Sequence, residues 1–443
     1  MTVEHLAARL ALAAALAACP SLAAAATNAE LEARVRDLEA ALMAVKAELA
    51  HQREPAPAAA TTAAAAPIAT LPVRTAALMP APAPMPSAPS FRFGGFVKLD
   101  AMVSDFQRGD PPAGDLVRDF YLPGAIPTAG DGEGRKVDLS ARQTRLWMAA
   151  NSKVGGHTVH AKIEGDFQTL PGTTDARTTN PVNFALRRAY VSVDGWLFGQ
   201  DWSTFQNVAV LPETADYLGP TEGTVFVRQA QVRYTRGAFS VALENPESTV
   251  TPLGGGARIV ADDNALPDLV ARMDVKRPFG EFALAGLARR LSVEQGPLKD
   301  SAIGWGVSAS GRLKVGERDD IRFMATTGEG IGRYVGLNFA NDAAVDATGQ
   351  LEAIPVTAGF VSYRHAWTDV IRSTVTWSAQ VVDNPAAAGP AANHAAYSAH
   401  ANLVWTPLSG FDVGVEYMYG RRELESGVSG DLDRLQGFAR YLF

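Results

Sequence analysis

The chain closes on the stretch Gln436-Gly437-Phe438-Ala439-Arg440-Tyr441-Leu442-Phe443. Successive side chains of an extended chain point to opposite faces, so the odd-numbered residues of this stretch share one face and the even-numbered residues share the other. The odd face carries Tyr441 and the terminal Phe443, and the even face carries Gln436 and Arg440. The pattern predicts a β-strand that ends on an aromatic residue. Weaker alternating segments elsewhere in the chain can then be counted as further strands.

The same alternation starts again at Phe91. From Phe91 to Val103 the odd positions are apolar or Gly, and the even positions include Lys98 and Asp100. Similar segments occur at residues 143–151, 162–168, 229–234, 269–276, 303–312 and 411–419. A strand with one face toward lipid and the other toward water requires this pattern, and about sixteen such segments fit between Phe91 and Phe443.

The connections between these segments alternate in length. Short turns are expected around Gly155-Gly156, Asp194-Gly195, Arg236-Gly237, Arg277-Pro278, Gly316-Glu317, Ala366 to Asp369 and Pro407 to Gly410. Long polar stretches are expected at Asp105 to Asp138, Leu170 to Val182, Trp202 to Thr224, Asn245 to Leu266, Leu291 to Asp300, Gly328 to Glu352, Asp383 to Asn393 and Arg421 to Asp431. Short periplasmic turns and long outer loops are typical of an outer-membrane barrel, with both barrel ends in the periplasm. A soluble β-sandwich or propeller also alternates apolar and polar residues and is the rival interpretation.

Composition limits the alternatives. The 443 residues contain no window of eighteen consecutive apolar residues after the N-terminus, which argues against a helical membrane span. Only helices and closed barrels satisfy every backbone group in lipid, so a membrane protein of this composition has to be a barrel. The net charge of -7 and the absence of a basic run with interleaved aromatics argue against nucleic acid as a partner.

The first 26 residues resemble an export signal. Arg9 precedes an apolar stretch, and small residues around Ala26 offer a cleavage site. The only cysteine, Cys19, ends Leu16-Ala17-Ala18-Cys19, which also resembles the acylation site of lipoproteins. Cleavage near Ala26 would leave a mature chain without cysteine, and therefore without disulfide or thiol chemistry.

Two further segments precede the barrel pattern. In residues 27–50 the spacing of Leu31, Val35, Leu38, Leu42, Val45 and Leu49 alternates between four and three. This heptad seam predicts a short coiled coil of two to four strands, and a helix lying on its own domain's core is the alternative. Residues 51–90 are rich in Ala and Pro with almost no charge, which predicts a semi-extended linker.

Several motifs of residues 91–443 resemble the DcaP-like family of outer-membrane porins. They are Gly95 to Asp100, Arg142 to Leu146, Ile163 to Phe167, Leu186 to Tyr190, Gly199 to Phe205, Leu211 to Thr214, Arg228 to Tyr234 and Gly328 to Tyr334. Trp147 departs from the family, which more often has a small residue there. The resemblance implies a homotrimer with its coiled coil in the periplasm, and uptake of small anions such as dicarboxylates.

The strand parity also predicts which side chains line the barrel. The lumen-facing basic residues are Lys98, Arg145, Arg188, Arg233, Arg272, Arg312, Arg322, Arg364, Arg372, Arg434 and Arg440. The third long loop is expected to fold inward as a constriction and contains Trp202, Glu213 and Asp216. Rings of Arg or Lys in a narrow pore favour anions. The alternative is that these arginines only solvate the wall or pair with acids such as Asp100, Glu164 and Asp274.

Enzymatic function is not indicated. The five histidines of the barrel segment are scattered, and HExxH, GxSxG and EF-hand motifs are absent from the sequence. His400 and Asn402 share a strand face and are interpreted as lumen polar groups. We therefore expect an outer-membrane porin without cofactor or metal, whose partners are lipid, further copies of itself, small anions and, through its last strand, the barrel-assembly machinery. A tethering barrel with incidental conduction and a barrel hydrolase are the alternatives.

Overall fold

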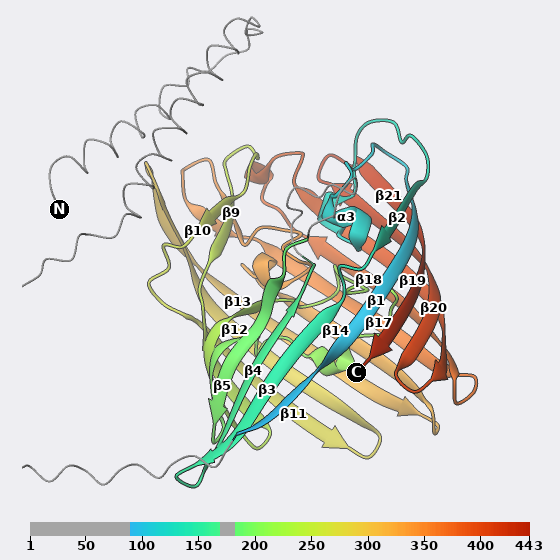
Figure 1. Cartoon of the computed structure of the whole chain (residues 1–443). Helices are drawn as coiled ribbons and strands as arrows, with labels where there is room; N and C mark the ends of the chain where they lie inside the picture. The colour runs from blue at the N-terminus through green and yellow to red at the C-terminus, as the bar shows by residue number, and fades with distance from the viewer. Residues whose placement is uncertain (1–88, 169–181) are drawn as a thin grey trace, which may run out of the picture. The chain divides into compact units, whose positions relative to one another are not determined.

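The structure, a computed structural model, describes residues 89–168 and 182–443. These residues form a closed antiparallel barrel of 16 strands, which confirms the predicted fold, and pairing of β1 with β21 closes it (Figure 1). The wall strands are β1 (Ser90–Phe106), β3 (Arg145–Val154), β4 (His157–Asp166), β5 (Ala185–Val193), β6 (Trp196–Trp202), β7 (Arg228–Arg236), β8 (Phe239–Glu244), β11 (Asp268–Arg277), β12 (Gly280–Gln295), β13 (Leu298–Val315), β14 (Asp319–Glu329), β17 (Pro355–Ala366), β18 (Ile371–Val382), β19 (Asn393–Leu408), β20 (Phe411–Leu424) and β21 (Ser429–Leu442).

One wall position is divided between two strands. β2 (Lys136–Ser140) pairs with residues 100–104 of β1, and β3 pairs with residues 90–96 of the same strand. β2 and β3 therefore follow one another along a single edge of β1, separated by residues 141–144. β1 itself begins at Ser90, one residue before the predicted start of the barrel.

The alternation in sequence becomes an inside and an outside. In β1, Phe93 is 80% exposed and Val97 55% exposed, whereas Lys98 and Asp100 are buried. The polar residues are buried because loops fill part of the lumen, and the apolar residues are exposed because they face the lipid. Within the described residues, no helix has both the length and the apolar character that a membrane crossing needs.

All seven predicted short turns join consecutive wall strands at one end of the barrel. Two of the predicted long loops are wrong. At residues 291–300, β12 and β13 continue to a tight turn at Gly296 and Pro297, and at residues 421–431, β20 and β21 continue to residues 425–428. Their polar sequences are strands that remain paired after the apolar band has ended.

Four loops at the other end carry structure of their own. We call them L1 (residues 107–135), L3 (203–227), L4 (245–267) and L6 (330–354). Their helical elements, together with one between β18 and β19, are α3 (Leu116–Asp119), η1 (Pro123–Ala125), η2 (Val208–Val210), η3 (Gly332–Tyr334) and η4 (Ala386–Ala388). L4 and L6 contribute β9 (Ser248–Thr251), β10 (Ile259–Ala261), β15 (Ala343–Val345) and β16 (Leu351–Ala353) to a small four-stranded sheet, near the top of Figure 1.

An apolar core lies inside the barrel, between L3, L6 and the wall. Phe205 and Val225 of L3 pack with Ile331 and Tyr334 of L6, against wall residues such as Val356. The backbone amide of Phe226 donates to the carbonyl of Tyr334 at 2.9 Å, which joins the two loops directly. L3 and L6 therefore fill part of the lumen as one unit.

Residues 1–88 and 169–181 lie outside the described residues. The predicted signal peptide (1–26), coiled coil (27–50) and nearly all of the linker (51–90) fall there, as does most of the loop predicted from Leu170 to Val182. These stay predictions.

Candidate functional site

L3 runs inward from β6 and is anchored on the far wall of the barrel. The side-chain amide of Asn402, on β19, donates to the carbonyl of Glu213 at 2.7 Å. The backbone amide of Ala215 donates to Glu416 on β20 at 2.9 Å, and Lys98 on β1 donates to the carbonyl of Ala215 at 2.6 Å. The tip of L3, residues 211–218, is therefore held across the lumen from the strands that carry the loop.

Five arginines gather beside this tip, and we call them the arginine cluster: Arg312, Arg322, Arg364, Arg372 and Arg440. Each reaches an acid, in the pairs Arg312–Asp320 (2.8 Å), Arg322–Asp320 (2.6 Å), Arg364–Glu213 (3.5 Å), Arg372–Glu213 (2.6 Å), Arg372–Asp412 (3.2 Å) and Arg440–Asp412 (2.6 Å). The result is a ladder of alternating charges that runs around the wall from β13 to β21. Five arginines share three carboxylates, so the ladder keeps an excess of two positive charges.

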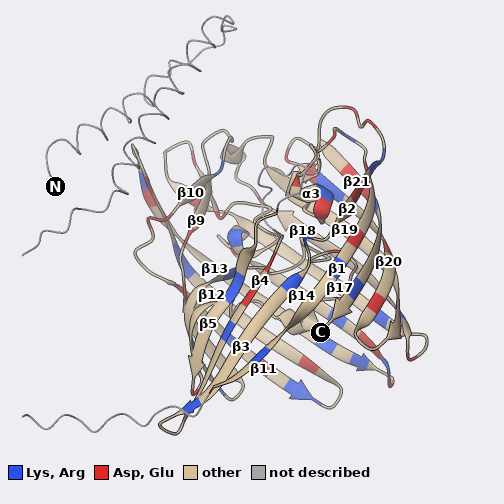
Figure 2. Cartoon of the chain, viewed as in Figure 1, with Lys and Arg blue, Asp and Glu red and all other residues tan. Residues whose placement is uncertain are grey.

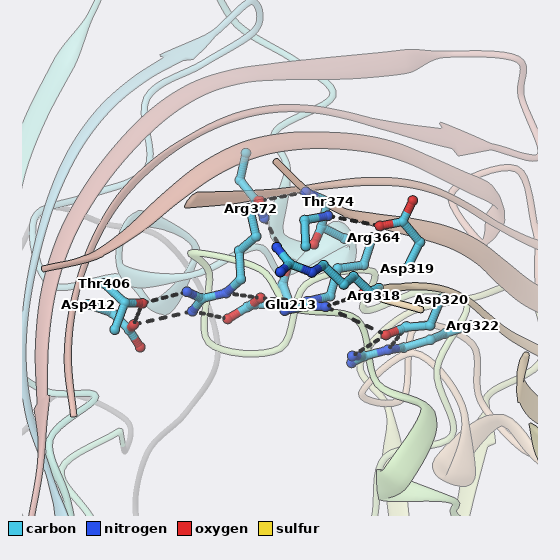
Figure 3. Close-up of polar contacts among 12 residues, drawn as sticks. Glu213, Arg318, Asp319, Asp320, Arg322, Arg364, Arg372, Thr374, Thr406 and Asp412 are labelled. Carbon is cyan, nitrogen blue, oxygen red and sulfur yellow. Dashed lines mark hydrogen bonds and ion pairs between the residues drawn. The ribbon is translucent and has the colours of Figure 1, made fainter. Parts of the chain in front are cut away.

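Arg372 occupies the centre of the ladder, between Glu213 on one side and Thr406 and Asp412 on the other (Figure 3). Its Nε and Nη2 donate to the two carboxylate oxygens of Glu213 at 2.7 and 2.6 Å, a bidentate geometry. Burial raises the pKa of Glu213, but the hydrogen bond and charge of Arg372 and the charge of Arg364 outweigh burial, and the pKa lies below its ordinary value. Glu213 is therefore a carboxylate at neutral pH.

The cluster borders open space. A cavity of about 440 Å³ is lined by Glu213 and by Arg312, Arg322, Arg364 and Arg372. A second cavity of about 320 Å³ lies on the β1 and β3 side of the L3 tip, and its lining includes Lys98, Arg145, Arg187, Glu213 and Arg440. Basic side chains thus face free volume on both sides of L3, and Figure 2 shows Lys and Arg along the barrel wall as well as in the loops.

The chain's match to a family model spans most of the barrel. Residues 123–443 match the model of the DcaP outer membrane protein family. The chain belongs to the DcaP outer membrane protein family. It has the fold of outer-membrane channels, and the outer membrane is its location.

Solved structures of outer-membrane proteins are similar to this chain. The outer membrane channel DcaP of Acinetobacter baumannii is 25% identical, with 80% of this chain and 97% of that chain covered and a TM-score of 0.66. OmpT of Vibrio cholerae, in a trimer form, is 13% identical, with 81% and 100% covered and a TM-score of 0.46. No curated protein sequence matches the chain.

The other predicted basic residues of this DcaP-family barrel lie away from the L3 tip or are locked by partners. Arg188 and Arg233 both pair with Asp201, at 2.6 and 2.7 Å. Arg145 approaches Asp166 at 3.4 Å and lies over the ring of Tyr217 in L3. Lys98, Arg272 and Arg434 are held respectively by Asp100 at 2.9 Å, Asp274 at 3.0 Å and Ser104 at 2.8 Å.

The predicted loop residues take three different positions. Trp202 ends β6, and the guanidinium groups of Arg187 and Arg228 lie over its ring. Glu213 meets the arginine cluster. Asp216 is largely buried, and its carboxylate accepts from the backbone amide of Tyr121 at 2.6 Å, which joins L3 to L1. Both acids line the cavity of about 320 Å³, and Glu213 also lines the cavity of about 440 Å³.

Arg187 was missed by the parity argument. A β-bulge between Glu164 and Gly165 leaves Arg187 without a partner position on β4, so Arg187 and its neighbour Arg188 both reach lumen acids. Arg187 contacts Glu164 at 3.2 Å and Asp166 at 2.5 Å. A run of two arginines in an alternating strand was the sequence signal for such a bulge.

Three buried residues, Ser398, His400 and Glu416, contact one another in the order serine, histidine and acid that is found in the catalytic triads of hydrolases. His400 Nε2 lies 3.3 Å from the Ser398 hydroxyl, and Nδ1 lies 3.2 Å from Glu416. All three side chains are buried, and Glu416 also accepts from the L3 backbone at Ala215. Glu416 therefore helps to hold L3 in place, and the buried triplet offers no room for a substrate. Among the described residues, no group of three or more His, Cys, Asp or Glu could hold a metal ion.

The buried carboxyl of Glu222, in L3, should make the docking of L3 in the lumen depend on pH. Burial raises the pKa of its carboxyl, an effect that Ser398 and His400 only partly offset. A raised pKa means that the docked loop keeps a proton that the free loop loses, so docking is most stable below the ordinary pKa and weakens as pH rises through the raised value. Glu222→Gln should remove this loss.

Thermal unfolding of the purified barrel at a series of pH values checks this expectation. The wild-type barrel should lose stability from acid to neutral pH, and the Glu222→Gln barrel should lose less. Glu317→Gln changes an exposed acid in the turn between β13 and β14 and is the matched control. Parallel stability curves for all three proteins would show that Glu222 does not titrate with docking.

Proposed function

We propose that this channel passes small anionic solutes of the dicarboxylate type by passive diffusion. The observation that carries the proposal is the arginine cluster, where five arginines share three carboxylates beside free volume at the L3 tip. The whole chain carries a net charge of -7, so the positive excess at this level runs against the overall charge.

The electrostatic reason is confinement. Charges in a narrow, poorly screened lumen lower the barrier for ions of opposite sign, and the two arginine charges left after pairing supply such a field. The acids on the ladder hold the guanidinium groups in place and sharpen the field locally. If every arginine were neutralised by an acid, the arginines would only solvate the barrel wall. The proposal therefore rests on the two positive charges that remain after pairing.

Free volume favours a channel over a tethering barrel. L3 and L6 leave cavities of about 440 and 320 Å³ on the two sides of the L3 tip, both lined by arginine. A barrel that served only as an anchor would have no need of water-exposed arginines inside. Catalysis is not part of the proposal, because the Ser398–His400–Glu416 triplet is closed off by L3.

Swelling of proteoliposomes tests the proposed solute class. Liposomes that contain the purified protein should swell faster in succinate than in a neutral or cationic solute of similar size, because only the anion gains from the positive excess. Protein-free liposomes and liposomes with heat-denatured protein are the controls. Equal rates for the three solutes would exclude a charge preference, and no swelling above the controls would favour the tethering alternative.

We also propose the remaining features of assembly. The N-terminal coiled coil, in the periplasm, would associate three copies into a homotrimer, since its heptad seam needs partner helices and the family resemblance points to a trimer. The last strand, whose terminal Phe443 is half exposed, would be the segment that the barrel-assembly machinery recognises. The export signal in residues 1–26 would bring the chain to the periplasm first.

Deleting residues 28–50 should leave a folded barrel that inserts in the outer membrane. The 16 strands close their own hydrogen bonds, and no described wall strand draws a partner from that segment. Heat-modifiable migration in gels and the amount in outer-membrane fractions check the result. If the deletion variant failed to insert, the coiled coil would be required for barrel formation rather than for association.

A further inference from the structure

At the centre of the ladder, Arg364 and Arg372 of the barrel wall form an anion site, and the carboxylate of Glu213 from L3 occupies it. Besides Glu213, Arg372 donates to Thr406 on β19 at 2.6 Å and to Asp412 on β20 at 3.2 Å. Arg364 donates to the carbonyl of Arg318 at 3.2 Å. These wall contacts keep the two guanidinium groups in position without Glu213. The carboxylate of Glu213 is the one part of the site that comes from L3 (Figure 3).

The loop, in turn, does not depend on that carboxylate. Arg322 donates to the carbonyl of Leu211 at 2.6 Å, and Asn402 donates to the backbone carbonyl of Glu213 itself. Ala215 is held through its amide by Glu416 and through its carbonyl by Lys98. The backbone on both sides of Glu213 is therefore fixed by bonds that its side chain does not make, so removing the carboxylate leaves the L3 tip in place.

Solutes can reach the site. The side chains of Glu213, Arg364 and Arg372 are 23%, 23% and 15% exposed, and the three residues line the same cavity of about 440 Å³. The bidentate contact between Glu213 and Arg372 has the geometry that an organic acid would adopt with the same guanidinium. In chemical terms, Glu213 stands where the carboxylate of a solute would bind.

We propose that Glu213 is a tethered competitor: its carboxylate occupies the Arg364–Arg372 anion site and weakens the binding of solute carboxylates there. The inference rests on the proposed anion pathway and identifies the residue that sets its affinity. Because it is tethered, the Glu213 carboxylate is present at a high effective concentration, so a dilute solute displaces it only briefly. A channel needs such weak binding, because a solute that is held too tightly does not leave.

Glu213→Gln removes the competitor while it keeps the side-chain volume. The variant should bind carboxylates more tightly, since two guanidinium groups then lack their closest anion. In single-channel recordings of purified protein, succinate should interrupt the current for longer in the variant and reach half-block at a roughly tenfold lower concentration. Glu213→Asp keeps the charge on a shorter side chain that reaches Arg372 less well, and its half-block concentration should fall between the two.

Glu423→Gln is the matched control. Glu423 pairs with Arg421 at 2.7 Å near the loop end of β20, away from the cavities at the L3 tip. The same chemical change there should leave succinate block as in the wild-type channel. The double variant Glu213→Gln with Arg372→Gln should lose the gain, because the freed guanidinium is the group that binds.

The recordings separate failure of this inference from failure of the proposed function. In an anion-selective wild-type channel, an unchanged half-block concentration in both Glu213 variants would overturn the inference alone. Higher conductance in Glu213→Gln, equal for both ions and without stronger block, would assign Glu213 to loop pinning and also overturn it. A wild-type channel with no anion selectivity would contradict the proposed function itself. If Glu213→Gln failed to fold, wild-type behaviour of Glu213→Asp would decide against the inference.

Discussion

Replacing Arg322, Arg364 and Arg372 together with Gln should reverse the ion preference of the channel. The arginine cluster then keeps two arginines, Arg312 and Arg440, against the three carboxylates of Glu213, Asp320 and Asp412, so its excess becomes negative. Gln keeps most of the volume and hydrogen bonding of Arg. The anion-to-cation permeability ratio should fall by roughly tenfold or more, because confined charges at these distances contribute on the order of a kcal/mol or more each.

The triple variant of Arg145, Arg188 and Arg233 is the comparison. Arg188 and Arg233 share Asp201, and Arg145 lies beside Asp166, which Arg187 also contacts at 2.5 Å. Arg188 and Arg233 line neither of the two cavities at the L3 tip, so we expect a smaller change in the permeability ratio. Equal effects of the two triple variants would mean that selectivity is spread over the whole lumen. An unchanged permeability ratio in both triple variants would mean that the arginines only solvate the barrel wall.

Replacing Arg289 with Met should release L6 and widen the lumen. Arg289 is fully buried and bonds Asp342 at 3.0 Å, Asp268 at 3.3 Å and the carbonyl of Gly330 at 3.1 Å. Without it, Asp342 stays buried with no cationic side chain paired to it, and removing one partner of a buried ion pair costs about 3–5 kcal/mol. Single-channel conductance should rise for anions and cations alike.

The neighbouring residue provides the control. Arg290 is exposed and donates to Ser301 at 3.0 Å, so Arg290→Met makes the same change on the other face of β12. Its conductance should equal that of the wild-type channel. Wild-type conductance in Arg289→Met, in a barrel that folds normally, would show that L6 stays in place through its apolar contacts with L3.

The sequence predicted the wall of the barrel well because the lipid imposes a strict pattern. Each crossing strand needs an apolar outer face and each turn needs Gly, Pro or Asp, so the strands and all seven short turns could be located. The two wrong loops, at residues 291–300 and 421–431, lie beyond the lipid band. No lipid contacts the outer face of these strands there, so their residues need not alternate between apolar and polar. A hairpin made of polar residues has the same composition as a loop.

The interior was less predictable because several loops that are distant in sequence build it together. L6 packs against L3 through Ile331, Tyr334 and Val335, and a short apolar run in a long loop does not reveal where it docks. Strand parity did not separate Arg372, which borders a cavity, from Arg434, which is buried beneath L1. Such distinctions depend on the loop above each strand, and parity carries no information about that loop.

The reversal potential of the wild-type channel shows whether the positive excess at the L3 tip controls permeation. Purified protein in a planar bilayer is placed across a KCl gradient at low ionic strength, where the screening of lumen charges is weakest. We expect a reversal potential with the sign of chloride permeating faster than potassium, and a smaller magnitude as the salt concentration rises. A reversal potential of zero, or one with the sign of potassium, would contradict the claim that the positive excess at the L3 tip controls permeation.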